Sequence, residues 1–240
     1  MIVQKYNYKT LDRQTATSGV RHYADRGVRM PSVTTILSST KDKSGLDKWI
    51  AKVGKEEAER IKNEAAKIGT AMHETIEDYI IGKTYEPKDD DEKHAVKMAK
   101  VIIDQAFDNI NEIWGSEVHL HYMDQYAGTT DLVGLYKGKP AIMDFKQTNK
   151  PKRREWIEDY FIQLAAYAEA HKRHHGEILT GAVLMCTRDL EFQLFEINES
   201  QMLNYVNKWW DRYDRYRIKA KSEQPRQESE PTNETLSSTP

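Results

Sequence analysis

The stretch that decides the expected fold runs from Tyr126 to Gln147 and reads YAGTTDLVGLYKGKPAIMDFKQ. Two largely apolar halves suit β-strands at about 126–136 and 140–147. If Lys137-Gly138 between them is a two-residue hairpin loop, Tyr136 faces Lys139 in an antiparallel pair. In the same register, Asp131 on the first strand lies directly opposite Asp144 on the second.

Two carboxylates and a lysine gather on this hairpin. Alternation along the second strand puts Ile142, Asp144 and Lys146 on one face. Opposed residues have Cβ atoms about 4.5–5.5 Å apart, so Asp131 and Asp144 would repel each other, and a divalent metal ion is the obvious counter-ion. An exposed strand face with an internal ion pair is the alternative for an Asp-x-Lys tripeptide alone. The apolar neighbours of Asp144 instead favour a buried strand end, where a carboxylate needs a partner or a metal.

Composition indicates a soluble protein with a sizeable core, since 38% of the 240 residues are hydrophobic and 31% are charged. The apolar runs are far shorter than a membrane span, and the start lacks the apolar stretch of a signal peptide. We therefore expect a cytoplasmic protein (of the host cell, if phage-encoded) without a membrane partner. The single cysteine, Cys186, excludes an intrachain disulfide and an iron–sulfur cluster built from this chain's cysteines. It lies in an apolar run that predicts a buried strand, so we expect a core thiol.

A formal net charge of −2 gives the chain no global basic field of the kind that indicates nucleic-acid binding. Contact with a polyanion would have to use a local patch. Basic residues crowd just after the second strand of the hairpin, at Lys146, Lys150, Lys152, Arg153 and Arg154. Phosphate contact and an ordinary exposed loop are both open interpretations of this run.

The order of the remaining segments predicts one domain over 31–218, with a mixed sheet flanked by helices. An irregular segment with one hairpin at most, 1–30, would precede it, and a disordered polar tail, 219–240, would follow it. Helices are expected to start near Ser32 or Thr34, and over 55–81 with a stop at Gly82; Gly69 predicts a break or a close backbone approach. The other expected elements are a helix over about 91–114, a strand near 117–123, a helix over 155–174, strands near 178–187 and 191–197, and a helix over 199–218.

Five segments, in this order, resemble the PD-(D/E)xK nuclease superfamily, and within it the RecB-type exonucleases of phages and of mitochondrial genome maintenance. The segment PSVTTIL at 31–37 looks like the N-terminal signature of these enzymes, and Gly69-x-x-x-His73 looks like their histidine motif. The sequences GTTD at 128–131 and DFK at 144–146 match the two metal-binding motifs, and Gln163-x-x-x-Tyr167 matches the RecB-type helix motif. The resemblance covers about 31–215. It departs from some relatives in lacking a four-cysteine cluster and any helicase motif, which leaves a stand-alone exonuclease.

The resemblance implies a restriction-endonuclease-like fold, with an αβββαβ core and here an N-terminal helical extension. It also implies Mg²⁺, with Mn²⁺ as a substitute, held by His73, Asp131, Asp144 and the backbone carbonyl of Phe145. Lys146 would orient the attacking water or stabilise the pentacoordinate phosphate.

Further residues are expected to support the site. The resemblance implies substrate contacts from Gln163 and Tyr167, and the position of the basic run beside the site adds Lys150, Lys152, Arg153 and Arg154. Glu77 and Glu117 would support the metal ligands; a solvated helix face is the alternative for Glu77, and a strand-edge ion pair is the alternative for Glu117.

These observations predict a metal-dependent DNA exonuclease that prefers single-stranded ends, with Trp49 and Trp156 as aromatic platforms for bases or as core residues. The alternatives are a double-strand recombination exonuclease on the same fold, a catalytically silent DNA-binding module, and a hydrolase of small phosphoesters. The complete set of Asp131, Asp144 and Lys146 argues against the silent module, which has no use for all three.

Overall fold

A five-stranded sheet forms the centre of the protein in a computed structural model that describes residues 2–17 and 19–222. The strand order is β4-β5-β6-β7-β8. The strands are β4 (Ile110–Tyr122), β5 (Tyr126–Tyr136), β6 (Lys139–Thr148), β7 (Thr180–Thr187) and β8 (Phe192–Ile197). Strands β6 and β7 run parallel and the other neighbours run antiparallel, which confirms the expected mixed sheet.

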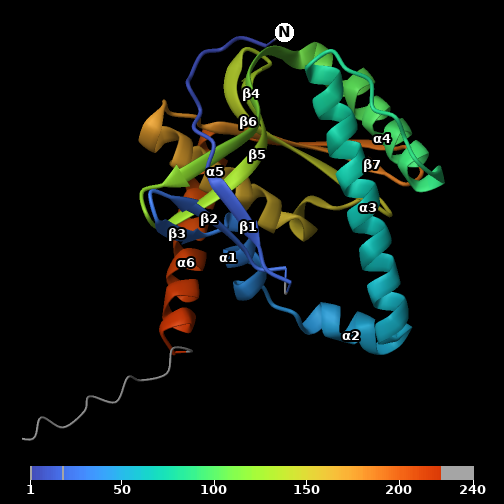
Figure 1. Cartoon of the computed structure of the whole chain (residues 1–240), viewed down its shortest axis with the longest axis horizontal. Coiled ribbons are helices and arrows are strands. Elements are labelled where there is room, and N and C mark those ends of the chain that lie inside the picture. The colour runs from blue at the N-terminus through green and yellow to red at the C-terminus, as the bar shows by residue number, and fades with distance from the viewer. Residues whose placement is uncertain (1, 18, 223–240) are drawn as a thin grey trace, which may run out of the picture.

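Helices cover both faces of this sheet (Figure 1). On one face, α3 (Lys55–Ile80) and α4 (Asp90–Ala106) bury a core that includes Met143 and Phe145 of β6. On the other face, α1 (Val33–Thr40), α5 (Glu158–His174) and α6 (Glu199–Ser222) bury a core that includes Ile142. Alternate residues of β6 thus enter opposite cores, as the strand period requires. The order α4-β4-β5-β6-α5-β7 is the expected αβββαβ order.

The β5–β6 hairpin has the predicted register. Tyr136 pairs with Lys139, and the ladder continues to the pair Leu132 and Met143. Left-handed φ angles of 50° at Lys137 and 76° at Gly138 fit a two-residue loop whose twist matches the flanking strands. The ladder stops just before Asp131 and Asp144, where the Asp131 carboxylate instead accepts the Phe145 N–H at 2.7 Å.

The expected helix over about 91–114 is wrong in its last part. Helix α4 ends at Ala106, a short 3-10 helix η1 (Phe107–Asn109) follows, and β4 begins at Ile110. The buried residues Ile110, Ile113 and Trp114 have the i, i+3, i+4 spacing of a helix because β4 carries two register shifts in this stretch. A β-bulge inserts an extra residue and so interrupts the alternation that identifies a strand.

The N-terminal segment is more ordered than expected. Strands β1 (Asp12–Thr15), β2 (Arg21–Asp25) and β3 (Val28–Pro31) form a three-stranded antiparallel sheet, so the irregular segment predicted for 1–30 is wrong over these strands. Tyr23 and Met30 of this sheet pack with Ala127 of β5 in a small core of their own. The extension that precedes the αβββαβ core therefore contains a sheet as well as helices.

The helices after this sheet agree with the sequence-based predictions at some positions and differ at others. Ser32 caps α1 by accepting the Thr35 N–H at 3.0 Å, as expected. Helix α2 (Ser44–Val53) was not predicted. Helix α3 passes through Gly69 without a break, and a Cβ there would meet Gln147 at an ordinary 3.8 Å, so neither effect predicted for Gly69 occurs. Gly82, with a φ of 73°, follows the end of α3 as predicted.

The end of the described chain also extends beyond its expected limit. Helix α6 continues to Ser222, so 219–222 are helical, and the rest of the predicted disordered tail, 223–240, lies outside the described residues. Cys186 is buried in β7 as expected, and burial raises the pKa of its thiol to about 11. Within the described ranges, no helix combines the length and the apolar character that crossing a bilayer demands.

Candidate metal and catalytic site

Most of the predicted site residues meet in one cleft of about 620 Å³, which we call the acidic cleft. Helix α3 supplies His73, Glu74 and Glu77, and the five-stranded sheet supplies Glu117, Asp131 and Lys146. Gln163 and Tyr167 line it from α5. The small N-terminal sheet and α1 complete it with Arg13, Arg21 and Thr34.

Three side chains in the acidic cleft form a group that could hold a metal ion. His73, Glu117 and Asp131 each offer a ligand atom, and these atoms all lie within 4.8 Å of one another. Ser116 pairs with Leu132 and Val118 pairs with Thr130, so Glu117 lies opposite Asp131 across β4 and β5. In the described ranges 2–17 and 19–222, no other such group of three or more ligands occurs.

The backbone at Glu117 is strained, with a φ of 50°. A non-glycine residue in this left-handed region costs about 1–3 kcal/mol, and such residues cluster at functional sites. Burial and the nearby charge of Asp131 raise the pKa of Glu117 to about 7, while His73 and Arg13 oppose the shift. Two carboxylates that are held together in this way favour a cation between them.

The backbone of Phe145 orients two of these three groups. Its N–H donates to Asp131 Oδ2 at 2.7 Å, and its carbonyl is 2.9 Å from His73 Nε2. If His73 is neutral, that contact assigns the proton to Nε2 and leaves the Nδ1 lone pair facing Asp131 Oδ1, 3.6 Å away. The Phe145 carbonyl thus holds the histidine in this structure, and its role as a metal ligand stays a prediction.

Asp144 and Lys146 form a pair beside this group. Asp144 is 1% exposed, and its Oδ2 is in an ion pair with the Lys146 ammonium. Burial raises the pKa of Asp144 above its ordinary value, and the charge of Lys146 opposes that shift. Burial by itself lowers the pKa of Lys146, but the charges of Asp144 and Asp131 outweigh it and raise that pKa to about 12. Lys146 is thus a protonated, fixed cation at neutral pH.

Helix α5 supports the pair from behind. Gln163 Nε2 lies 3.4 Å from Asp144 Oδ1 and 3.2 Å from the Tyr167 hydroxyl, so the two motif residues of α5 form one chain of contacts to the carboxylate. Tyr167 also explains the glycine of the GTTD motif. A Cβ at Gly128 would lie 2.6 Å from Tyr167 Cε1, closer than real carbon atoms approach.

The basic residues that were expected to contact substrate lie outside the acidic cleft. Lys150, Lys152, Arg153 and Arg154 do not line the acidic cleft. The backbone of Lys152 is tied to the Gln193 side chain of β8, and the guanidinium groups of Arg153 and Arg154 lie over the rings of Trp156 and Phe161. Trp156 itself is 62% exposed, and Trp49 is 37% exposed.

Sequence reasoning missed Arg13, Arg21 and Thr34, which do line the cleft. The available signal was the alternation in the N-terminal strands, where Arg13 and Thr15, and Arg21 and Tyr23, are spaced two apart. It was too short to outweigh the polar composition of that segment.

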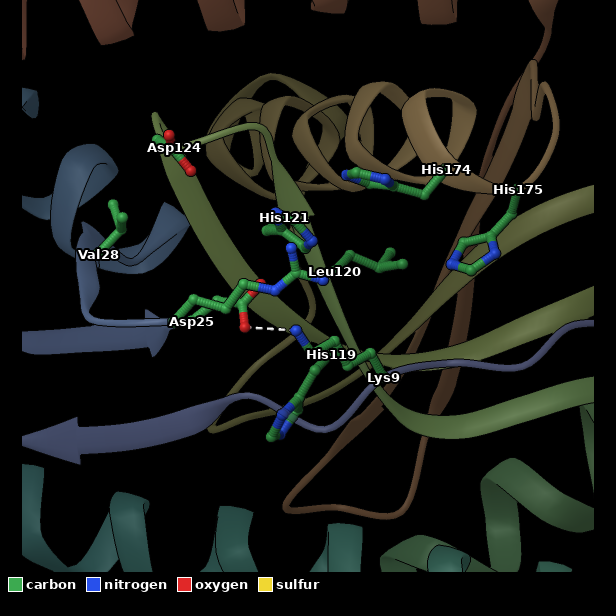
Figure 2. A pocket seen from close by; sticks show the side chains of 10 residues that line it. Lys9, Asp25, Val28, His119, Leu120, His121, Asp124, His174 and His175 are labelled. Carbon is green, nitrogen blue, oxygen red and sulfur yellow. Dashed lines mark hydrogen bonds and ion pairs between the residues drawn. The ribbon is translucent and has the colours of Figure 1, made fainter.

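A second pocket has a volume of about 560 Å³ (Figure 2). Strand β2 contributes to both pockets: Arg21 at its start lines the acidic cleft, and Asp25 at its end lines the second pocket. Four histidines line it, His119, His121, His174 and His175. The rings of His121 and His174 lie against each other with centroids 4.2 Å apart, and His119 Nδ1 accepts the Leu11 N–H. Asp25 and Asp124 also line this pocket, but the His121 ring packs on His174 rather than joining a carboxylate in a group of metal-ligand type.

Comparison with known proteins gives a similar curated protein and similar solved structures. No family model matches the chain. The chain is 25% identical over 213 residues to mitochondrial genome maintenance exonuclease 1 of Xenopus tropicalis. The aligned region covers 82% of this chain and 60% of the length of that relative. A crystal structure of a candidate exonuclease from Eubacterium rectale matches with a TM-score of 0.44 and 16% identity, covering 65% of each chain. The similarity to the Xenopus relative supports the expected resemblance to exonucleases, and the assignment to the PD-(D/E)xK superfamily stays a prediction.

Proposed function

We propose that this protein is a metal-dependent DNA exonuclease that acts preferentially on single-stranded ends. The observation that carries the proposal is the meeting of His73, Glu117 and Asp131 beside the Asp144–Lys146 pair in one cleft. The similarity to a curated exonuclease supports a nuclease function. Phosphodiester hydrolysis needs a positioned water, neutralisation of charge on the phosphate and help for the leaving oxygen.

The donor set fits a hard divalent ion. His73 Nδ1, Glu117 and Asp131 offer one nitrogen and carboxylate oxygens, ligands that Mg²⁺ and especially Mn²⁺ accept. Burial and then the neighbouring charge of Asp131 raise the pKa of Glu117, and a bound cation would offset both effects. When bound, such an ion would polarise the phosphate and lower the pKa of a water.

The residues of this chain have separable tasks in the proposal. Asp144 fixes the Lys146 ammonium, and Gln163 and Tyr167 fix Asp144. Because Lys146 stays protonated, it acts as a charge that stabilises the transition state rather than as a base. We propose that one oxygen of Asp144 anchors Lys146 beside the metal ligands, and the role of Asp144 as a metal ligand itself stays a prediction.

Preference for single strands is the finer part of the proposal. Trp156, exposed and next to Arg153, offers a base-stacking surface with a cation beside it. The net charge of −2 supplies no field that would attract a stiff duplex, so binding depends on a few local contacts.

A digestion assay tests the whole proposal. End-labelled single-stranded DNA, blunt duplex and closed single-stranded circles are incubated with Mg²⁺, Mn²⁺ or EDTA. We expect rapid loss of the linear single strand with either metal, slower loss of duplex, and no loss of circles or with EDTA. Cleavage in EDTA would refute metal dependence, equal rates on duplex would refute the strand preference, and cutting of circles would refute the exonuclease. Binding without cleavage under all conditions would instead indicate a silent DNA-binding module.

A further inference from the structure

Two arginines of the N-terminal sheet line the acidic cleft together with Asp131 and Lys146. In the β1–β2 register Arg13 faces Tyr23 and Thr15 faces Arg21, so the side chains of Arg13, Arg21 and Tyr23 share one face of the small sheet. Tyr23 is 1% exposed, and its hydroxyl lies 2.8 Å from Thr129 Oγ1 of β5. The shared face is therefore turned toward β5 and the cleft.

Neither arginine is in an ion pair, although the charge of Arg13 acts on Glu117. In the described part of the chain no ion pair or side-chain hydrogen bond is formed by either guanidinium, and the Nε of Arg21 is buried without any hydrogen-bond partner. Arg188 and Arg212, by contrast, form ion pairs with Glu64 and Asp159, although the Nε of Arg188 is likewise buried without a partner. A buried donor without a partner costs about 1–3 kcal/mol, so Arg21 is held ready for an acceptor that the chain itself does not provide.

The two positive charges also lie near each other. Arg13 and Arg21 are diagonal neighbours across the strand pair, a relation that places Cα atoms about 7–8 Å apart. Two cations at that spacing repel each other unless an anion lies between or beside them. A guanidinium presents a fork of N–H donors that matches the oxygens of a phosphate group.

The walls of the cleft carry opposite charges. Glu74, Glu77, Glu117 and Asp131 line it from α3, β4 and β5, while Arg13 and Arg21 line it from the N-terminal sheet. Carboxylates alone would repel a phosphate chain. Basic residues in the same lining offset this repulsion and give the phosphates of a polyanionic strand a place to bind beside the candidate metal ligands.

We propose that Arg13 and Arg21 bind backbone phosphates of the substrate strand next to the phosphate that is cut, an inference that rests on the proposed nuclease function. They are positioning residues that act on the strand rather than on the breaking bond. Loss of such binding, which is equal in the ground state and the transition state, raises KM and leaves kcat nearly unchanged.

The test combines kinetics with the salt dependence of binding. For R13Q/R21Q we expect KM for a single-stranded oligonucleotide to rise about 10-fold or more, with kcat within a few fold of wild type. Binding in EDTA, measured by fluorescence anisotropy across a salt series, should show a log–log slope shallower by about 1.4, because each lost phosphate contact removes about 0.7. R13K/R21K keeps the charges and should restore the slope.

Arg29 supplies a matched control on the same sheet. It pairs with Ala24, so it projects from the opposite face to Tyr23, and its guanidinium contacts the His22 ring at 3.1 Å. R29Q should keep the wild-type KM and slope. Arg13 is exposed, so R13Q alone should remain folded and shift the slope by about 0.7, which keeps the test decisive if the double variant fails to fold.

The outcomes separate this inference from the proposed function. If wild type degrades DNA but R13Q and a folded R13Q/R21Q keep its KM and slope, the phosphate site is refuted and the nuclease stands. If wild type binds DNA with an arginine-dependent slope but never cleaves it, the nuclease is refuted and the phosphate site stands. A loss of slope in R29Q equal to that in R13Q would also refute the site, because it would show a general charge effect.

Discussion

The acidic cleft and the histidine pocket lie at opposite ends of β2, and both contain histidine, yet their electrostatics are opposite. In the acidic cleft, His73 meets Asp131 and Glu117, and burial together with the charge of Asp131 raises the pKa of Glu117. Around the second pocket, His121, His171, His174 and His175 pack mainly ring against ring, a set that we call the histidine cluster. Burial and neighbouring histidines lower the pKa values of His174 and His175.

The comparison teaches that the partners of a histidine decide its role more than its presence in a pocket does. A histidine lone pair that faces carboxylates can share a cation with them, whereas rings packed on one another disfavour the protonation of His174 and His175. The two regions should therefore differ in their response to mutation, to pH and to metal.

The largest difference should appear in activity. We expect D131N to lose DNA cleavage by at least about 100-fold, because even residues that only support metal ligands cost 10–100-fold. Its melting temperature should hold or rise slightly, since the repulsion with Glu117 disappears. H121N in the histidine cluster should keep wild-type activity. A D131N protein within a few fold of wild type would remove Asp131 from the metal site.

The next effect is the acid sensitivity of the histidine cluster. Burial lowers the pKa of His171 from 6.5 to about 4, so between these values the folded state binds fewer protons than the unfolded state. The contribution of neutral His171 to the free energy of unfolding is therefore fully present above pH 6.5 and is lost as the pH drops toward 4. At about 1.36 kcal/mol per pKa unit, the loss is about 3 kcal/mol.

Urea unfolding of wild type and H171Q at pH 7.5 and 4.5 measures this effect. The variant loses contacts to the Tyr8 hydroxyl and the Gly176 carbonyl, so its stability at pH 7.5 should be lower, but its pH dependence should be flatter. Equal pH dependence in both proteins would contradict the assignment to His171.

The acidic cleft should make the free energy of unfolding fall with rising pH, by somewhat less than the histidine cluster makes it fall with decreasing pH. The pKa of Glu117 rises from 4.5 to about 7, so the metal-free folded state binds more protons than the unfolded state in this interval. In EDTA, the contribution of protonated Glu117 to the free energy of unfolding is fully present below pH 4.5 and is lost as the pH rises through 7. Because the side chain is partly exposed, we expect a loss of about 2 kcal/mol.

The E117Q variant and added Mn²⁺ test whether Glu117 causes this pH dependence. E117Q should abolish the fall above pH 5 in EDTA, and Mn²⁺ should reverse the fall in wild type only, with proton release detectable by calorimetry in two buffers. If Mn²⁺ stabilises E117Q as strongly as wild type, Glu117 is not a ligand.

The smallest expected difference concerns two glycines. G128A places a methyl 2.6 Å from the buried ring of Tyr167, and we expect a loss of about 1–3 kcal/mol in unfolding free energy. G176A places its methyl 2.9 Å from the Tyr6 hydroxyl, the end of a side chain that can turn, so its cost should be below about 1 kcal/mol. Thermal melts compare the two, and a larger loss in G176A would mean that Tyr6 is held more firmly than Tyr167.

The elements that sequence reasoning predicted well are those decided by neighbours in the chain. The Lys137-Gly138 loop and the alternation beyond it specify the β5–β6 register, and Ser32 and Gly82 mark helix ends by local hydrogen bonding and backbone freedom. The start of β4 was misread because its bulges give buried residues a helical spacing. Whether a residue pairs across a bulge depends on the partner strand, which local sequence does not contain.

The sequence by itself determined that Asp131, Asp144 and Lys146 share one face of a hairpin, because a two-residue loop and the strand period leave no other register. Only the tertiary structure decided which groups join them. Glu117 reaches Asp131 through the bulged pairing of β4, and Arg13 and Arg21 reach the cleft because the N-terminal sheet docks on β5 through Tyr23. The basic run Lys150–Arg154 stays outside because contacts with β8 and nearby aromatic rings hold it. These placements depend on contacts between segments far apart in the chain, whose free energy no local pattern records.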